Sequence, residues 1–468
     1  MADRRNVDVG DDLSSAPPGM TVANAAVAGA AVPGATVTQP DPPAETRPVV
    51  DQDPVSWLTI TLIVVAAFGS GLALVVPMAF SMALRLTELA PGSEQVLGYI
   101  LGVGALCSLV SAPLTGIVSD RTRSRWGRRR PFTVLGVAIG LAAVPVLAFA
   151  PNAIVLGIGW MLTSVGWGTA GGSIGNLLAD RLPESQRGKV SGLTGLAGQV
   201  SPVLGILLAG QFTGDALLLF LVPATVGAVM VALFILFVPE ADSRHLTFKN
   251  RLTFPRFAKS LLFRPRDHPA FAWALVGRFF FFFGLFLTVA YGTYFYAQRL
   301  GVPVAEVSSV MAVISASGVL SAALGSLGGG WVSDRFGTRR SWAAASTMIF
   351  ATGCVVSAFS WTFPMLVTGA LLTNLGIAAF GSVGQALILD VLPFRETEAG
   401  RFLAITSFSQ RIPSAIGPLA APLLLGLAPS DETQYLVLYL SAAALALLGG
   451  AVTLTLATER DRMDPKIT

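Results

Sequence analysis

Amide and aromatic side chains interrupt long apolar stretches of this chain, and they are the first candidates for chemistry. An amide can form paired hydrogen bonds with the hydroxyl groups of a solute, and an aromatic ring can pack beneath a solute's apolar face. Together they predict a site for a neutral polyol such as a sugar. The alternative for any single member is a hydrogen bond between packed helices or an anchor at a membrane surface. The set comprises Asn176, Gln199, Asn374, Gln385, Gln410, Trp160, Trp167, Tyr291 and Tyr294.

Two arginines, Arg278 and Arg411, lie about ten residues inside apolar stretches, which is about 15 Å along a helix. An arginine at such a depth in a bilayer costs about 2.5–3.5 kcal/mol, and no Asp or Glu lies equally deep to pair with it. We therefore expect both to face an aqueous cavity, where their charge would favour an anionic solute. The alternative, strongest for Arg278, is that the guanidinium extends to the membrane surface or binds backbone carbonyls.

The stretch GIVSDRTRSRWGRRRPF, Gly116 to Phe132, places six arginines and one aspartate between two apolar runs. A carboxylate at a helix end can accept charge-assisted hydrogen bonds from arginines and from the amino end of another helix, whose dipole favours an anion. Asp120 is thus a candidate for a contact that forms only when two parts of the molecule close on each other. The alternative is that loop arginines serve only as topology signals. We prefer that alternative for Arg123, Arg125 and Arg130.

The elements that carry these residues are predicted to be membrane-spanning helices. Hydrophobic residues make up 53% of the chain and charged residues only 12%, well below the roughly one quarter of soluble domains. Twelve apolar runs reach about the 20 residues that a helix needs to cross a bilayer, and they lack the two-residue alternation of a barrel strand. The predicted fold class is an all-α membrane protein with twelve transmembrane helices. The predicted spans are 56–84, 95–118, 131–150, 153–179, 190–212, 216–238, 270–297, 307–332, 341–359, 362–389, 402–428 and 434–457.

The distribution of basic residues predicts the orientation. Of the 31 Lys and Arg residues, 27 lie in the first segment, in alternate loops and in the last segment, whereas the opposite loops hold only Arg85 and Arg299. Because basic loops stay in the cytosol, we expect a multi-pass protein of the plasma (inner) membrane with both termini cytosolic. The sequence pI of about 9.3 then follows from topology and anionic lipid, without a nucleic acid partner.

An internal repeat predicts two halves. Residues 131–179 and 341–389 are both charge-free runs of 49 residues, offset by 210, and Ser119-Asp120-Arg121 recurs as Ser333-Asp334-Arg335. Residues 1–54 hold no run apolar enough to pack, so we expect a disordered tail rather than a signal peptide. The predicted parts are a cytosolic tail at 1–54, six-helix halves at 55–238 and 270–457, a cytosolic linker at 239–269 and a cytosolic tail at 458–468.

With this repeat, the chain resembles the major facilitator superfamily, whose members consist of two such halves that rock about a central site. The resemblance covers the chain from about residue 55 onward. Its most specific feature is the Gly-x-x-x-Asp-Arg-x-Gly-Arg-Arg loop, which Gly116, Asp120, Arg121 and Gly127 to Arg129 match with four additional residues before Gly127. The longer loop SDRTRSRWGRRRPF and the segment LLADRLP look like the sucrose and glycoside (glycoside-pentoside-hexuronide) symporter branch.

The resemblance implies that charged residues at the cytosolic helix ends latch the outward-facing state. It also implies that Asp180 and Arg187 handle a coupling proton, although a latch role explains their place near the membrane surface equally well. Sodium coupling of the melibiose type fits less well, because helices 2 and 4 hold no acid in their interior, and uniport is the remaining alternative. The implied latch residues are Asp120, Arg121, Arg128, Asp180 and Arg187, with Asp334, Arg335, Arg339, Asp390 and Arg401 as the second-half copy.

The residues and the resemblance together indicate a secondary transporter, with proton-coupled uptake of a sugar or glycoside as the first hypothesis. Proton-antiport efflux of a drug or metabolite, and transport of an organic anion, are the alternatives; a non-transporting sensor or scaffold is the hypothesis from another class. No enzyme activity, cofactor or metal site is expected, because no Walker A loop, zinc-ligand spacing or nucleophile and base pair stands out. The expected partners are a small-molecule substrate, the lipid bilayer and a coupling proton, and we expect a monomer.

Overall fold

The computed structural model of the chain describes residues 55–240, 242–245, 263–336, 338–394, 398–430 and 433–463. Every regular element among these residues is a helix, which confirms the predicted all-α fold class. The predicted tail at 1–54, and residues 246–262 of the predicted linker, lie outside the described residues. The first-half helices are α1 (Trp57–Val76), η1 (Pro77–Ser81), α2 (Met82–Leu89), α3 (Gln95–Asp120), α4 (Arg130–Ala148), α5 (Ala153–Arg181), α6 (Glu184–Ala209), η2 (Gly210–Phe212) and α7 (Ala216–Phe237). The second-half helices are α9 (Pro269–Val289), α10 (Gly292–Leu300), η3 (Val304–Glu306), α11 (Val307–Phe336), α12 (Arg339–Ala358), α13 (Phe363–Asp390), α14 (Ala399–Gly426) and α15 (Gln434–Met463).

Eleven helical stretches in the described part of the chain are long and apolar enough to cross a membrane, and each coincides with a predicted span. The twelfth predicted span, 402–428, is occupied by α14. This helix has 28 residues, so its length suffices, but it contains three prolines and carries Gln410 and Arg411. Such polar content is expected of a helix that faces an interior cavity as well as lipid.

Two predicted spans are interrupted within their length. The first continues from α1 through the π-helical turn η1 into α2 and ends at Leu89, five residues beyond the prediction. The prediction of one continuous helix over 270–297 is wrong, because α9 ends at Val289 and α10 begins at Gly292. Between them Tyr291 has φ −112° and ψ 9°, and its hydroxyl is bound by the backbone of α3. The break therefore coincides with a tertiary contact that local apolar content does not reveal.

The helices pack in the same pairs in both halves. α4 packs on α5 and α1 on α7, and their repeat counterparts α12 and α13, and α9 and α15, also pack on each other. Gly136 of α4 lets the backbone of α5 approach so closely that an added Cβ would lie 2.6 Å from the Ala170 nitrogen. Gly353 of α12 allows the same close approach of α13, since an added Cβ there would lie 2.5 Å from the Thr373 nitrogen.

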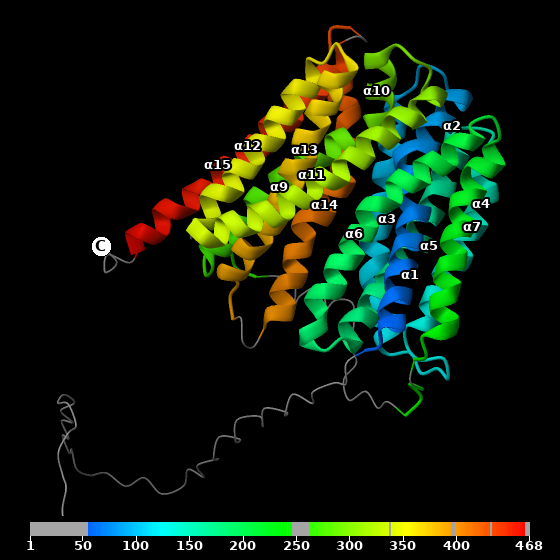
Figure 1. Ribbon diagram of the computed structural model, residues 1–468, viewed down its shortest axis with the longest axis horizontal. Helices are drawn as coiled ribbons and strands as arrows, with labels where there is room; N and C mark the ends of the chain where they lie inside the picture. The colour runs from blue at the N-terminus through cyan, green and yellow to red at the C-terminus, as the bar shows by residue number, and fades with distance from the viewer. Residues whose placement is uncertain are drawn as a thin grey trace, which may run out of the picture. The chain divides into compact units, whose positions relative to one another are not determined.

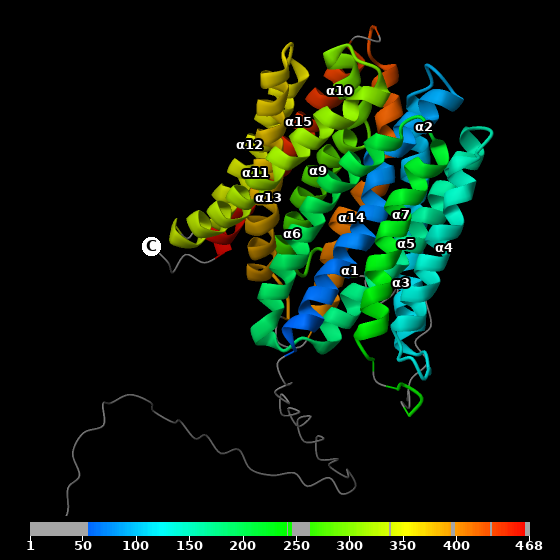
Figure 2. The ribbon, with the colours of Figure 1, turned by 45° about the vertical axis from the view of Figure 1, so that its right-hand side comes forward.

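The two sets of helices contact each other through α3 with α14 and through α6 with α11. Figures 1 and 2 both show α2 and α10 at one end of the bundle. We call this end the tyrosine end, after Tyr291, Tyr294 and Tyr435. The opposite end carries Arg129 and Arg339, and we call it the basic end.

Candidate functional site

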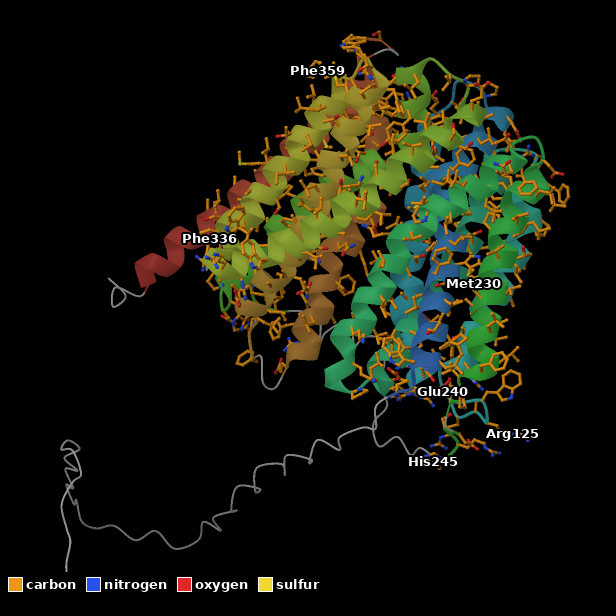
Figure 3. The ribbon with its side chains drawn as sticks, in the orientation of Figure 1. Arg125, Met230, Glu240, His245, Phe336 and Phe359 are labelled. Carbon is orange, nitrogen blue, oxygen red and sulfur yellow. The ribbon has the colours of Figure 1, made fainter. Side chains whose placement is uncertain are left out.

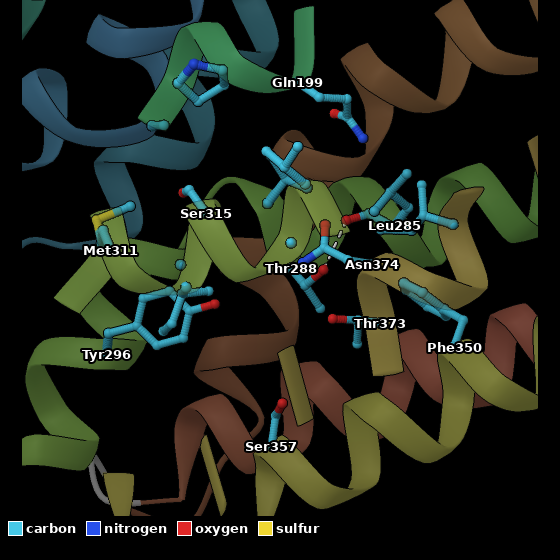
Figure 4. A pocket seen from close by; sticks show the side chains of 18 of the residues that line it. Gln199, Leu285, Thr288, Tyr296, Met311, Ser315, Phe350, Ser357, Thr373 and Asn374 are labelled. Carbon is cyan, nitrogen blue, oxygen red and sulfur yellow. Dashed lines mark hydrogen bonds between the residues drawn. The ribbon is translucent and has the colours of Figure 1, made fainter. Parts of the chain in front are cut away.

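A cavity of about 230 Å³ lies among α6, α9, α10, α11, α12, α13 and α15, and Ala79 of η1 also lines it (Figure 4). Gln199 reaches it from α6, whereas Thr288, Ser315 and Asn374 come from the second half. Within the part of the chain that the structure describes, its lining holds no charged side chain, so we call it the neutral cavity. Its amide and hydroxyl side chains are Gln199, Thr288, Tyr296, Ser315, Ser357, Thr373, Asn374 and Tyr439.

Hydrogen bonds to helix carbonyls orient the polar side chains of the neutral cavity. The Thr288 hydroxyl donates to the Leu285 carbonyl at 2.9 Å, and the Thr373 hydroxyl and the Asn374 amide nitrogen both donate to the Ala370 carbonyl, at 2.8 and 2.9 Å. Each oxygen therefore keeps lone pairs for a solute hydroxyl. The arrangement suits a solute that offers several hydroxyl groups.

A second cavity of about 250 Å³ lies between the halves, among α1, η1, α3 and α5 on one side and α9 and α14 on the other. Arg411 is the charged residue in its lining, so we call it the arginine cavity. Trp160 and Phe286 contribute aromatic walls, and Val289 lines both cavities. The two cavities are therefore neighbours, one neutral and hydroxyl-rich and the other largely apolar with a single cation.

The aromatic candidates occupy different places from one another. Trp160 lines the arginine cavity, whereas Trp167 is buried against α4, where a Cβ on Gly140 would lie 2.5 Å from its Nε1. Tyr291 and Tyr294 lie at the tyrosine end and line neither cavity.

Some of the remaining polar candidates line a cavity and others do not. Gln199 and Asn374 line the neutral cavity and Arg411 lines the arginine cavity. Three others are exposed on α5, α13 and α14 and line neither cavity. These are Asn176, Gln385 and Gln410.

Arg278 lies in a separate small cavity between α9, α13 and α15, lined also by Phe380 and Gly384. Its guanidinium carbon lies 5.0 Å from the ring centre of Phe282. Its Nε and Nη1 atoms have no hydrogen-bond partner among the described residues. The structure therefore separates Arg278 from Arg411, which the sequence had grouped as cavity residues.

Hydrogen bonds join the two halves at the tyrosine end. The Tyr291 hydroxyl accepts from the Gly98 amide and donates to the Gln95 carbonyl, both at 3.1 Å. The Tyr294 hydroxyl donates to the Ala83 carbonyl at 2.9 Å, and the Tyr435 hydroxyl donates to the carboxylate of Glu94. These bonds hold α9, α10 and α15 against α2 and α3, so this end is closed.

Arg129 is the centre of the charged cluster at the basic end of the first half. Its guanidinium contacts Asp120 at 2.5 Å, Asp180 at 3.2 Å and the Ser119 hydroxyl at 2.5 Å, and its side chain is only 7% exposed. Arg128 adds a second contact to Asp180 at 2.7 Å. The cluster thus ties together the ends of α3, α4 and α5.

Glu240 occupies the amino end of α4. Its carboxylate accepts hydrogen bonds from the backbone amides of Arg128, Arg129 and Arg130, at 2.9–3.1 Å. These amides have no partner within the helix, and the helix dipole favours an anion there. Gly127, with φ +88°, makes the turn beside it, where a Cβ would lie 2.3 Å from the Glu240 carboxyl carbon.

Glu240 belongs to a segment that we call the strap, residues 238–240 and 242–245, which follows α7. The buried Ser243 hydroxyl accepts from the Ser124 amide and donates to the Thr122 carbonyl, both at 2.9 Å. Figure 3 shows Glu240 and His245 at the same end as Arg125. Arg244 bonds Asp242 and lowers the pKa of that carboxyl to about 2, so the pair stays ionised well below neutral pH. The strap fixes the loop between α3 and α4, residues 121–129, to the end of α7.

The second half has ion pairs of its own at the basic end. Arg339 contacts Asp390 at 2.7 Å, and Arg401 contacts Glu398 at 2.5 Å within one helical turn. The Arg335 guanidinium lies 5.6 Å from the Trp331 ring centre. The side chains of Arg187 and Asp334, both predicted latch residues, lie outside the described part of the chain.

The described ion pairs at the basic end each join residues of the same half. Sequence reasoning did not include Arg129 or Glu240 among the site residues. The repeat could have found Arg129, because an offset of 210 maps Arg129 and Asp180 onto Arg339 and Asp390. Glu240 has no such signal, since only the folding of the strap brings it to α4.

Comparisons with known proteins agree with this architecture. The sequence profile of the Major Facilitator Superfamily matches residues 58–327 and 313–467. Solute carrier family 45 member 3 of Mus musculus is 46% identical over 55 residues, 11% of this chain and 10% of that protein. The putative multidrug resistance protein MdtD of Salmonella paratyphi B is 30% identical over 116 residues, 25% of this chain and 23% of that protein.

The matched segments therefore span a quarter or less of these curated relatives. A crystal structure of a mutant of the nucleoside transporter NupG superposes with a TM-score of 0.67 at 14% identity, covering 85% of this chain and 99% of that chain, which shows a common fold. Because the family profile covers most of the sequence and the fold agrees, the chain belongs to the Major Facilitator Superfamily.

Proposed function

We propose that this member of the superfamily is a secondary transporter for a sugar or glycoside, resembling the sucrose and glycoside branch. The observation that carries the proposal is the neutral cavity, whose amides and hydroxyls come from both halves. Neutral hydrogen-bonding groups in a desolvated pocket favour a solute with many hydroxyls, because an unpaired polar group on either partner would be costly.

The described state is proposed to be the inward-facing one. Tyr291, Tyr294 and Tyr435 bridge the halves at one end, whereas the described ion pairs at the basic end stay within a half. The predominance of basic residues at the latter end supports its assignment to the cytosol. Alternating access would break the tyrosine contacts and bring the two basic clusters together.

Uptake into proteoliposomes tests the proposal. Purified protein is given an inward proton gradient and labelled sucrose, maltose or glucose, and we expect concentrative uptake that a protonophore abolishes. Asn374→Ala should raise the half-saturating concentration about tenfold, since one charge-free hydrogen-bonding side chain contributes about 0.5–1.5 kcal/mol and leaves partners unpaired. No movement of any sugar under these conditions would reject the proposal.

The role of Asp180 is a separate question, and we propose that it acts in the latch rather than as the carrier of the coupling proton. Asp180 accepts from Arg128 and Arg129 at the end of α5 and lines neither cavity, which favours a latch role over a proton carrier. In the same liposomes, Asp180→Asn should slow transport and leave its response to the proton gradient intact. If uptake by this variant no longer responds to the proton gradient, Asp180 carries the coupling proton.

Export by proton antiport is the second candidate. It is supported by the largely apolar wall of the arginine cavity, which suits a hydrophobic solute, and by the partial similarity to MdtD. Exclusion of an amphipathic dye, driven by a gradient of the opposite direction, would favour export over uptake.

A further inference from the structure

From the two neighbouring cavities we infer that the solute is an amphipathic anion: a polyol or glycoside that carries an apolar, carboxylate-bearing group bound beside Arg411. The inference rests on the proposed transport of a polyhydroxylated solute. It specifies the second chemical group that this solute carries.

The first observation is the isolation of Arg411. It projects from α14 into a cavity between the halves, and no described carboxylate lies within ion-pair distance of it. The Ser414 hydroxyl bonds the backbone carbonyl of Arg411 rather than competing for the guanidinium. The Arg411 side chain is exposed in this state, so its charge is accessible to an anion that enters the cavity and can form a charge-assisted hydrogen bond with it.

The second observation is the character of the surrounding wall. Trp160 is 3% exposed, and it lies with Leu101, Phe286 and Pro418 around the cavity that Arg411 enters. A wall of this kind suits an aromatic or alkyl body rather than a hydrated inorganic ion, whose water shell it could not replace. The chemistry of the arginine cavity therefore selects an organic carboxylate.

The third observation is the relation between the cavities. Val289 lines both, and their volumes are about 230 and 250 Å³. Small-molecule sites typically occupy about 300–1,000 Å³, a size that neither cavity reaches alone and that both reach together. One solute with a hydroxyl-rich end and an apolar acidic end would occupy the pair.

The charge of Arg411 also has a consequence for reorientation. An empty carrier that closes around an unpaired guanidinium must desolvate it, whereas a carrier loaded with an anion closes around a neutral pair. Binding of the acidic solute should therefore favour reorientation, and exchange of internal for external solute should exceed net flux.

The test uses two glucosides that differ by one carboxylate, 4-carboxyphenyl β-D-glucoside and phenyl β-D-glucoside. Calorimetry on the purified full chain at pH 7 should give the acid a Kd about ten to a hundred times lower, as expected for charge-assisted hydrogen bonds. Arg411→Gln should remove this preference and leave the Kd of the neutral glucoside within twofold. Arg411→Lys should restore part of the preference, and Arg123→Gln, which removes a loop arginine, should change neither Kd.

Three outcomes would overturn the inference: equal affinity for the two glucosides, equal weakening of both by Arg411→Gln with an unchanged melting temperature, or net flux equal to exchange. Benzoate and benzamide separate this result from the proposed function. If neither glucoside binds but benzoate binds in preference to benzamide and loses that preference in Arg411→Gln, the arginine cavity stands and the sugar proposal fails. If both glucosides bind without discrimination, the sugar proposal stands and this inference fails.

Discussion

The basic ends of the two halves carry the same ion pair in two different settings. Arg129 with Asp180 and Arg339 with Asp390 are equivalent under the 210-residue repeat. The Arg129 side chain is 7% exposed and contacts Asp120, Asp180 and Ser119, whereas the Arg339 side chain in its pair with Asp390 is 33% exposed. A duplicated pair has thus become part of a buried cluster on one side and has stayed near the surface on the other.

The strap is a second difference between the two halves. After α7 ends at Phe237, the strap (residues 238–240 and 242–245) contacts the loop between α3 and α4, and Glu240 caps α4. α15, the counterpart of α7, continues as helix to Met463. The described residues therefore provide a cap for α4 that comes from the end of α7, and they provide no equivalent from the end of α15. The Arg–Asp pair is thus present in both halves of the repeat. The carboxyl ends of α7 and its counterpart α15 differ, and so does the environment of the pair.

Arg129→Gln should have the largest effect. It removes the shared partner of Asp120 and Asp180 from a nearly buried position, and we expect the free energy of unfolding to fall by about 2–4 kcal/mol. Denaturant titration in detergent micelles measures the loss. Arg128→Gln is the matched control, because the Arg128 side chain is 32% exposed and its ion pair among the described residues is with Asp180, so it should cost about 1 kcal/mol or less.

Gly127→Ala should follow, at about 2–3 kcal/mol, because it combines a left-handed backbone with overlap against Glu240. Gly92→Ala is the control: φ is +74° there and no atom lies within 4 Å of an added Cβ, so only the backbone cost of about 1–2 kcal/mol applies. Equal losses in the two variants would show that the strap yields to an added methyl group.

Glu240→Ala should cost about 1–2 kcal/mol, because the first amides of α4 lose their acceptor. Glu240→Gln keeps an acceptor and loses the charge, so it should cost less than half as much. If Gly127→Ala is combined with Glu240→Ala, the overlap disappears and the double variant should be less destabilised than the sum of the two. If the losses of the two single variants simply add in the double variant, overlap with Glu240 does not contribute to the cost of Gly127→Ala.

Arg339→Gln should cost only about 0.5–1 kcal/mol, because its pair with Asp390 is solvated. The titration used for Arg129→Gln applies here. A loss as large as that of Arg129→Gln would contradict the difference drawn between the two halves.

Asp120→Asn should change stability least, since the Asp120 side chain is 52% exposed. We expect slower transport with an unchanged substrate Kd, because the carboxylate would be needed when the basic ends meet and not when solute binds. Uptake rates in proteoliposomes, read beside calorimetric Kd values, test this. A wild-type rate would remove Asp120 from the proposed latch.

The apolar runs and the charge-free repeats determined the helical fold class and the location of the spans, because the length and hydrophobicity of a membrane helix are local properties. They also placed Gln199, Asn374 and Arg411 on candidate cavity helices. They did not predict the break at Tyr291, whose hydroxyl bonds α3, almost 200 residues away in the sequence.

The sequence by itself thus determined which segments cross the membrane and that the chain repeats, because these features depend on composition and spacing along the chain. Only the tertiary structure decided which polar side chain meets which. It grouped Gln199 with Asn374, gave Arg411 a cavity apart from Arg278, and brought Glu240 to α4. The reason is physical: side-chain partners across helices depend on the rotation of each helix about its axis and on chain reversals, and neither is encoded in local hydrophobicity.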